Sequence, residues 1–256
     1  MIFETHAHYD DEAFNEDREE LIGQLQESGI GCVVNIGAGM ESCKTTIALM
    51  NEYDFFYGAL GIHPGSTAEL NEENFAWLSE RCKESKCVAV GEIGLDYYWD
   101  NPEREVQIEW FRRQLRLAKE LGLPVVIHSR EAAQDTIEIM KEEHAEEIGG
   151  VIHCYSYSKE IAREFLNMGF YIGVGGVITF KNGKKLKETV EAVPLEKIVL
   201  ETDCPYLAPE PYRGKRNSSL YLPYVVEQIA AIKGVTPEEV ERVTYENALK
   251  LYSKIK

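Results

Sequence analysis

Five of the six histidines in this 256-residue chain fall at the ends of short apolar runs. These five are His6, His8, His63, His128 and His153. The sixth, His144, lies in a polar segment of helical character. His6 and His8 are two residues apart, so on a strand their side chains project to the same face. Imidazole nitrogens gathered in this way are favourable ligands for transition metal ions.

Two carboxylates occur in similar settings. Glu92 lies inside the apolar run Val90-Gly91-Glu92-Ile93-Gly94, and Asp203 follows the run that ends at Leu200. Burying an unpaired carboxylate costs several kcal/mol, and no Lys or Arg lies near Glu92 in sequence to offset that cost. Divalent cations would offset it. Four imidazoles with two carboxylates suit one or two transition ions, whereas magnesium or calcium cages would contain fewer nitrogens.

The elements that must position these side chains alternate along the chain. Short β-branched runs predict eight strands, near residues 2–6, 32–36, 55–62, 88–93, 125–128, 151–153, 171–178 and 198–202. Segments of helical period lie between them, such as Glu105–Leu121 with Gly122 as its left-handed cap. The final helix is expected to begin at Thr236-Pro237-Glu238-Glu239, with Thr236 as the cap.

Eight βα units in about 250 residues are typical of an α/β fold of the TIM (β/α)8 barrel type. A doubly wound open sheet also alternates strands and helices, but no glycine-rich fingerprint follows the first strand. We find no linker or shift in composition, so we expect one domain over residues 1–256 with a C-terminal helix. In such a barrel, residues at the carboxyl ends of the strands meet at one face.

Composition limits the possible partners. The chain has 27 basic and 44 acidic side chains, a net charge of −17 that by itself repels nucleic acid and anionic membranes. No run approaches the roughly 18 apolar residues of a membrane span, and the N-terminus has no signal-peptide pattern. The six cysteines match no zinc or CxxC spacing, so we interpret them as reduced thiols of a cytoplasmic protein. No stable protein partner is implied.

Six motifs, in order and at suitable spacing over nearly the whole chain, resemble those of the TatD family of metal-dependent deoxyribonucleases. They are His6-Ala7-His8, Gly61-Ile62-His63-Pro64, Gly91-Glu92-Ile93-Gly94-Leu95-Asp96-Tyr97-Tyr98, Ile127-His128-Ser129-Arg130, Val151-Ile152-His153-Cys154 and Glu201-Thr202-Asp203-Cys204-Pro205-Tyr206-Leu207-Ala208-Pro209. The resemblance implies a barrel hydrolase that holds two divalent metal ions (zinc, manganese, magnesium or similar) and removes nucleotides from DNA in the 3′→5′ direction, at single strands or ends.

The resemblance also implies residue roles. One ion would bind His6, His8 and Asp203, the other would bind His128 and His153, and Glu92 would bridge the two. Two such ions can clamp a phosphodiester and generate hydroxide near neutral pH. We expect that hydroxide to attack phosphorus, with Asp203 accepting its proton.

His63 is not needed as a ligand. It would contact the phosphate or protonate the leaving group, or it would only make a supporting hydrogen bond. Three segments depart from the family pattern: Glu4 replaces the usual Asp, Gly65 replaces a frequent His, and Ser218-Ser219 replaces Glu-Pro. The last two are expected in substrate loops.

Two basic clusters are expected on the catalytic face, in the loops after the seventh and eighth strands, where barrels often bind phosphate. They are residues 180–185 and 212–217. Arg213 and Arg216 are the candidate phosphate ligands because a guanidinium matches phosphate oxygens in a bidentate manner, whereas the lysines are expected to be solvated surface. Tyr97, with Tyr98, Trp99 and Tyr155, lies beside ligand-bearing strand ends and either stacks on bases or packs at the rim.

Two other functions stay open. The same metal centre would also support an esterase or deacylase, for instance one that cleaves an aminoacyl ester on tRNA, because hydroxide attacks acyl carbon as readily as phosphorus. A non-catalytic metal-binding protein is the third hypothesis. It fits less well, because Asp203 and His63 supply proton-transfer groups that a storage site does not need.

Overall fold

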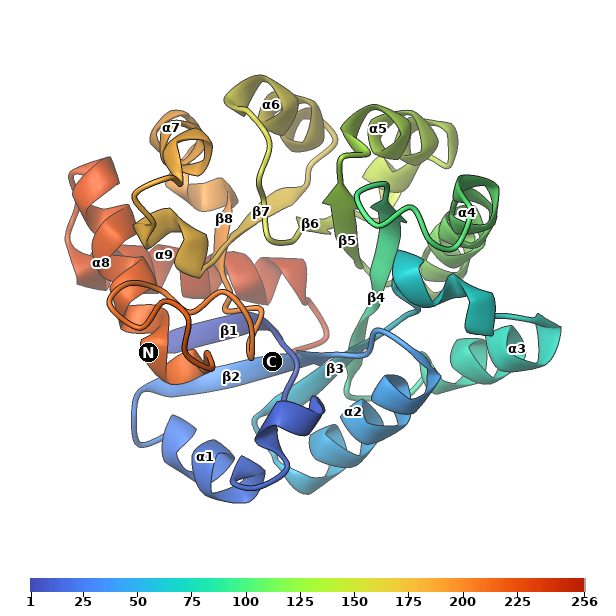
Figure 1. Cartoon of the computed structure of the whole chain (residues 1–256), viewed down its shortest axis with the longest axis horizontal. Coiled ribbons are helices and arrows are strands. Elements are labelled where there is room, and N and C mark those ends of the chain that lie inside the picture. Colours follow the sequence, from blue (N-terminus) through green and yellow to red (C-terminus); the bar gives the residue numbers. More distant parts are fainter. Residues whose placement is uncertain (256) are drawn as a thin grey trace.

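The computed structural model of the protein describes residues 1–255, and its centre is one parallel sheet in which eight strands follow one another in chain order. The strands are β1 (Ile2–Ala7), β2 (Ile30–Ile36), β3 (Phe56–Leu60), β4 (Cys87–Asp96), β5 (Val125–Arg130), β6 (Gly150–Ile152), β7 (Tyr171–Val174) and β8 (Ile198–Leu200). The sheet curls so that β1 meets β8 (Figure 1). Ala7 and Cys204 form a parallel bridge, and the Thr5 hydroxyl donates to the Leu200 carbonyl at 2.8 Å.

Helices surround the strands on the outside (Figure 1). The α-helices are α1 (Arg18–Leu25), α2 (Met40–Glu52), α3 (Glu72–Arg81), α4 (Arg104–Leu121), α5 (Ala133–Glu142), α6 (Lys159–Asn167), α7 (Lys184–Ala192), α8 (Leu222–Lys233) and α9 (Pro237–Leu251). Short 3-10 helices are η1 (Glu12–Phe14), η2 (Pro64–Glu69), η3 (Ala145–Glu147), η4 (Gly176–Thr179), η5 (Leu195–Lys197) and η6 (Ser219–Tyr221). The predicted TIM barrel is thus confirmed.

The predicted helix ends are also observed. Helix α4 ends at Gly122, whose φ of 63° lies in the left-handed region that glycine adopts without strain. The Thr236 side chain accepts a hydrogen bond from the Glu239 backbone N–H at 3.2 Å and so caps α9. No helix among residues 1–255 is long and apolar enough to span a membrane.

The barrel interior is filled at the amino ends of the strands. Phe3, Val34 and Val126 belong to an inner apolar cluster that includes Tyr252, at the end of α9. The Tyr252 hydroxyl donates to the Thr5 carbonyl at 3.0 Å. Because α9 and these side chains exclude water from that half of the barrel, the opposite half, at the carboxyl ends of the strands, is the one that holds polar groups.

Several strand predictions run past the observed carboxyl ends of the strands, the seventh by the most. The seventh strand was expected over residues 171–178, but β7 ends at Val174 and η4 follows. In η4 the backbone packs closely against the segment after β8, since a Cβ on Gly176 would lie 2.1 Å from the Leu207 carbonyl oxygen. The apolar residues beyond Val174 remain mostly buried, which is why the sequence pattern extends past the strand. All six cysteines are free thiols, as predicted.

Candidate metal centre

The first group of predicted ligands converges where the barrel closes. The Asp203 N–H donates to the His6 carbonyl at 3.0 Å, and the His8 N–H donates to the Cys204 carbonyl at 2.9 Å. These backbone bonds hold Asp203 beside the end of β1. Its Oδ1 lies 3.4 Å from His8 Nε2 and 3.6 Å from His6 Nε2. One ligand atom from each of the three residues falls within 4.8 Å of the others.

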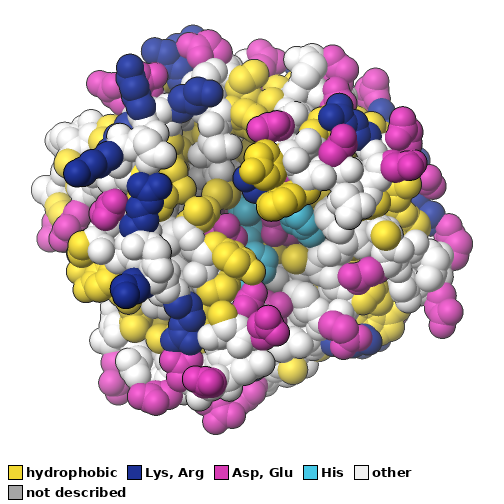
Figure 2. Space-filling view, in the orientation of Figure 1, with side chains coloured by type: hydrophobic (Ala, Val, Ile, Leu, Met, Phe, Trp, Pro, Cys, Tyr) yellow, Lys and Arg dark blue, Asp and Glu magenta, His cyan; other side chains and the backbone are white. Residues whose placement is uncertain are grey.

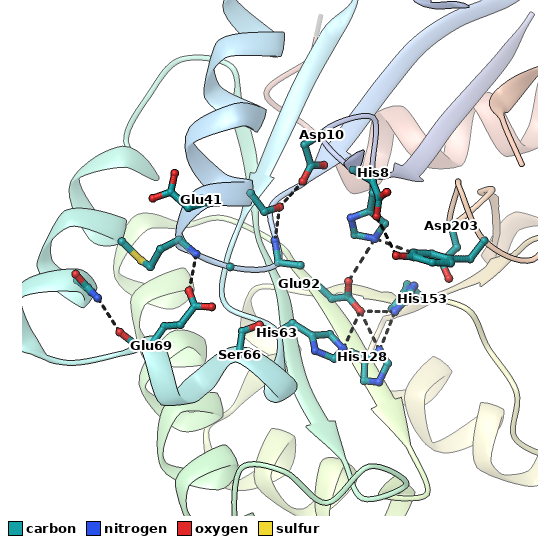
Figure 3. Close-up of a pocket in the computed structure, with 17 residues that line it drawn as sticks. His8, Asp10, Glu41, His63, Ser66, Glu69, Glu92, His128, His153 and Asp203 are labelled. Carbon is teal, nitrogen blue, oxygen red and sulfur yellow. Dashed lines mark hydrogen bonds and ion pairs between the residues drawn. The ribbon is translucent and has the colours of Figure 1, made fainter. Parts of the chain in front are cut away.

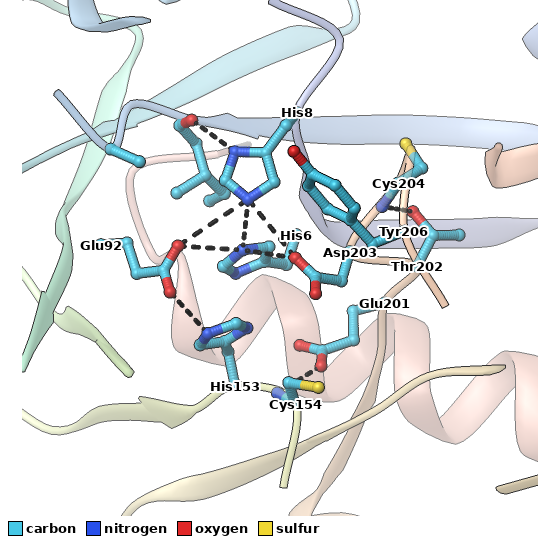
Figure 4. A network of polar contacts seen from close by, with 12 residues as sticks. His6, His8, Glu92, His153, Cys154, Glu201, Thr202, Asp203, Cys204 and Tyr206 are labelled. Atoms are coloured by element: carbon cyan, nitrogen blue, oxygen red, sulfur yellow. Dashed lines mark hydrogen bonds and ion pairs between the residues drawn. The ribbon is translucent and has the colours of Figure 1, made fainter. Parts of the chain in front are cut away.

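The second group lies across the Glu92 carboxylate. Glu92 Oε1 is 2.6 Å from His153 Nε2 and 2.9 Å from His128 Nδ1, and these two nitrogens are 3.1 Å apart. The other oxygen, Oε2, is 3.5 Å from His6 Nε2 and 3.7 Å from His8 Nε2. Glu92 therefore presents one oxygen to each pair of histidines (Figures 3 and 4).

The carboxylates control the charge of two of these histidines. Burial disfavours the protonated form of His8, but contact with Asp203 and the surrounding negative charge outweigh it and raise the His8 pKa to about 10. Burial likewise opposes protonation of His128, yet contacts with Asp96 and Glu92 raise its pKa to about 9. In turn, although burial favours protonated Glu92, the neighbouring histidines hold its pKa well below the usual range.

The residues fit divalent cations. His6 Nε2 and His8 Nε2 lie only 3.1 Å apart with carboxylate oxygens on either side, so nitrogen and oxygen lone pairs converge on one small space. Burial, reinforced by the charge of His153, lowers the His6 pKa to about 4 and keeps its nitrogens free to bind a metal. Mixed imidazole and carboxylate donors suit zinc, manganese or similar ions.

His63 borders the same centre, and ligand atoms of His63, Glu92 and His128 lie within 4.8 Å of one another. It follows β3, and its Nε2 lies 3.8 Å from Glu92 Oε1. Its Nδ1 accepts the Gly65 N–H at 3.0 Å, which leaves Nε2 as the ring nitrogen that carries the proton. Burial lowers the His63 pKa to about 4, so the neutral ring prevails at neutral pH.

Two buried carboxyls beside the centre were not among the predicted site residues. Asp96 ends β4, and its Oδ2 accepts from His128 Nε2 at 3.1 Å. Glu201 is 1% exposed and accepts the Cys154 N–H (Figure 4). One oxygen of Glu201 lies within 4.8 Å of a ring nitrogen of His6 and of His153. Both carboxyls occur in the six sequence motifs. Glu201 also follows an apolar run, as Glu92 lies in one, and this context could have identified it as a site residue from the sequence.

The pocket around Glu201 is shaped for a carboxyl group. A Cβ on Gly173, in β7, would lie 2.1 Å from Glu201 Oε2, so only glycine leaves room there. Glu201 Oε2, His6 Nδ1 and His153 Nδ1 are buried without a hydrogen-bond partner among the described residues. Imidazoles that bind metal ions usually donate their second N–H to such a carboxylate or to water.

Two departures from the family pattern contact each other. Glu4 is buried, and its Oε2 accepts hydrogen bonds from Thr202 Oγ1 at 2.7 Å and Ser219 Oγ at 2.9 Å. The longer Glu4 side chain thus joins β1 to the segment after β8. Burial raises the Glu4 pKa to about 7 despite these hydrogen bonds. Ser219 is buried against Glu4 and Tyr9, so it lies outside the substrate loops in which it was expected.

A pocket of about 810 Å³ opens onto the centre. Its floor includes His8, Glu92 and Asp203, and it extends over the start of α2 toward η2 (Figure 3). Acidic side chains border this extension, namely Asp10, Asp11, Glu41 and Glu69, and no Lys or Arg of the described chain lines it. Without bound cations, the negative charge of this pocket would therefore repel a phosphate group.

Of the predicted substrate residues, His63 lines this pocket, whereas Arg213, Arg216 and Tyr97 do not. Arg216 donates from Nη1 to Asp17 Oδ1 at 2.7 Å and to the Ala13 carbonyl. The Arg213 guanidinium lies 4.1 Å from the centre of the Phe180 ring. Tyr97 donates its hydroxyl to Asp135 Oδ2 at 2.7 Å. Each of these side chains already has a partner within the protein.

Comparison with known proteins identifies relatives of the chain. The sequence model described as "TatD related DNase" matches residues 3–253. A Bacillus subtilis protein named "Uncharacterized metal-dependent hydrolase YabD" is 45% identical over 98% of this chain and 99% of its own length. The "3'-5' ssDNA/RNA exonuclease TatD" of Cronobacter sakazakii is 32% identical over 94% of each chain. The solved structure of the TatD homologue YJJV from Escherichia coli has a TM-score of 0.92 and 30% identity over 98% of each chain.

Proposed function

This chain belongs to the TatD-related DNase family of metal-dependent hydrolases, and we propose that it cleaves phosphodiester bonds of DNA as a 3′→5′ exonuclease on single strands or ends. The observation that carries the proposal is the Glu92 carboxylate, with one oxygen toward His6 and His8 and the other toward His128 and His153. The exonuclease name of the Cronobacter relative supports the choice of substrate.

In this proposal, two divalent ions bind on either side of Glu92. His6, His8 and Asp203 would hold one ion, His128 and His153 would hold the other, and Glu92 would contact both. Bound there, the cations would activate water at neutral pH and offset negative charge on the phosphoryl oxygens. They would also make the acidic pocket able to accept a phosphodiester.

Asp203 and His63 would handle protons and orientation. Asp203 lines the pocket, and surrounding histidines hold its pKa below the usual value although burial opposes this. It is therefore ionised and able to accept the proton of the attacking water. His63 has its proton on Nε2 and a low pKa, so it would donate a hydrogen bond to a phosphate oxygen rather than act as a general acid at neutral pH.

One observation favours a second function, hydrolysis of a carboxylic ester such as an aminoacyl ester on tRNA. The pocket extension bordered by Asp10, Asp11, Glu41 and Glu69 would attract an ammonium group and repel a second phosphate. An aminoacyl ester carries such an ammonium next to the bond to be broken.

A single digestion experiment separates the two functions. The metal-loaded protein, with its metal content measured, is incubated in parallel with 3′-end-labelled single-stranded DNA and with an aminoacyl ester. The nuclease proposal expects metal-dependent release of nucleotides from the 3′ end. It also expects Asp203→Asn to lower that rate by about 10²- to 10⁴-fold while metal stays bound. Intact DNA with a cleaved ester would support the second function, and no turnover of either at full metal occupancy would contradict both.

A further inference from the structure

The turn between β4 and α4 exposes two adjacent aromatic side chains. Tyr98 is 50% exposed and Trp99 is 69% exposed, with their rings edge to face and 5.1 Å apart. Tyr97, just before them, is held inward by Asp135 and by the Arg104 guanidinium, which lies 4.1 Å from its ring centre. Internal packing therefore accounts for Tyr97 but leaves Tyr98 and Trp99 facing solvent.

Asp96 ties this exposed pair to the candidate metal centre. Its Oδ1 accepts the backbone N–H groups of Tyr98 and Trp99 at 3.0 and 3.1 Å. Its Oδ2 accepts from His128 Nε2 at 3.1 Å. A single buried carboxylate thus separates the turn from one of the histidines around Glu92. Hydrophobic side chains also border the hollow in which the histidines are visible (Figure 2).

Arg130 adds a cation to the same place. It ends β5, two residues after His128, and its guanidinium lies 3.9 Å from the centre of the Tyr98 ring. Among residues 1–255, no carboxylate lies within ion-pair distance of Arg130, whereas Arg216 is paired with Asp17. Arg130 therefore stacks on an exposed ring while its N–H groups remain available to an anion.

We propose that Tyr98, Trp99 and Arg130 form a nucleobase-binding site at the edge of the metal centre, a proposal that rests on the proposed DNA substrate. The aromatic faces would stack on bases near the scissile bond, and Arg130 would contact the adjoining phosphate. A protein partner is the weaker alternative, since two side chains cover far less than the roughly 800 Å² per partner of a stable interface.

The test compares a normal single-stranded oligonucleotide with one whose last three nucleotides lack bases. We expect Trp99→Ala and Tyr98→Ala to lower kcat/KM on the normal substrate by roughly 5- to 100-fold. On the abasic substrate the same changes should have little effect. Trp99→Phe, which keeps an aromatic face, should retain most of the wild-type kcat/KM on the normal substrate. Trp77→Phe, on the half-buried face of α3, is the matched control and should change neither rate.

A binding measurement separates this proposal from the proposed function. Anisotropy of both oligonucleotides, labelled at the 5′ end, is followed with metal-loaded wild type and variants. If wild type does not cleave DNA but binds the normal strand more tightly than the abasic one, and Trp99→Ala removes that difference, the base site stands and the nuclease function fails. Equal effects of Trp99→Ala on both strands would overturn the base site. So would a change of oligomeric state in light scattering without any change in DNA binding.

Discussion

The candidate metal centre and the basic loops on its rim both carry many charges, but the charges are buried and close together in the centre and are exposed or separately paired in the loops. In the centre, side chains in or just after six strands (β1, β3, β4, β5, β6 and β8) face one another, and the Glu92 carboxylate lies within 4 Å of five imidazoles. In the loops after β7 and β8, Arg216 pairs with Asp17 and Arg213 stacks on Phe180, while Lys181, Lys184 and Lys185 are exposed. Convergence of buried charges indicates a functional site, whereas a cluster of basic residues in sequence does not.

The largest expected effect comes from removing the charge that joins the two halves of the centre. Glu92→Gln keeps the side-chain shape but takes away the negative charge shared by both groups of histidines. Metal content should fall, and hydrolysis should drop about 10³-fold or more, because bound cations supply several kcal/mol of transition-state stabilisation. Metal analysis and initial rates on DNA measure this.

Glu143→Gln is the matched control for that change. Glu143 is also largely buried and paired with cations, Arg112 and Arg116, but it lies on the outer helices. Its replacement should lower stability without changing metal content. Full metal occupancy and activity in Glu92→Gln would contradict the role given to Glu92.

The next effect concerns pH. Metal-free His8 and His128 have pKa values of about 10 and 9, so both are protonated at neutral pH and must lose their protons to bind a metal. Metal affinity should therefore rise with pH, by up to about 100-fold per unit below pH 9 if both protons are released. Calorimetry in buffers of different ionisation enthalpy counts the protons, and binding without proton release would contradict these assignments.

The same pKa values affect the stability of the metal-free protein. Because the two pKa values are raised above the value of an unfolded histidine, about 6.5, the protonated rings stabilise the folded state fully below that pH. This contribution should be lost as the pH rises through 9 to 10. Thermal unfolding of metal-free protein from pH 6 to 10 should show the decrease, and a smaller decrease is expected in an Asp203→Asn, Asp96→Asn double variant, in which Glu92 still faces both histidines.

A smaller effect is expected from the carboxyl beneath the centre. Glu201→Gln should weaken metal binding by about 10- to 100-fold, the usual cost of losing a partner of a ligating histidine. Gly173→Ala should have a similar effect, because its Cβ would displace Glu201 Oε2. The visible spectrum of the cobalt-substituted protein should change in both variants. An unchanged spectrum and affinity would show that Glu201 only fills space.

The smallest effects belong to the rim. Arg216→Ala should lower stability by up to about 1 kcal/mol, since its pair with Asp17 is partly exposed. Arg213→Ala breaks no ion pair, so any effect of this change should appear in DNA binding and its salt dependence. Measuring both the free energy of unfolding and the slope of log Kd against log salt for each variant distinguishes a loss of stability from a loss of DNA binding. A steep loss of DNA binding in Arg216→Ala would mean that this arginine exchanges Asp17 for a phosphate.

Much of this could be predicted from sequence because the barrel constrains it. Apolar runs locate all eight strands, and the carboxyl ends of parallel strands share one face, which brings His6, His128 and His153 together. The length of β7 could not be predicted, because Val177 and Ile178 remain apolar in η4 after the strand has ended.

The remaining contacts depend on pairings across the chain. Arg216 and Asp17 are 199 residues apart, and Glu4 and Ser219 are 215 residues apart. No local pattern reports such pairs. Asp96 lies in a quoted motif, but only the structure shows that its two oxygens connect His128 with the exposed aromatic turn.

Two cations are proposed to bind on either side of Glu92, and anomalous diffraction from crystals of manganese- or zinc-loaded protein would locate them. We expect two anomalous peaks, one beside His6, His8 and Asp203 and the other beside His128 and His153, with Glu92 contacting both. A single peak away from Glu92, or ions bound only by the acidic side chains of the pocket extension, would contradict this arrangement.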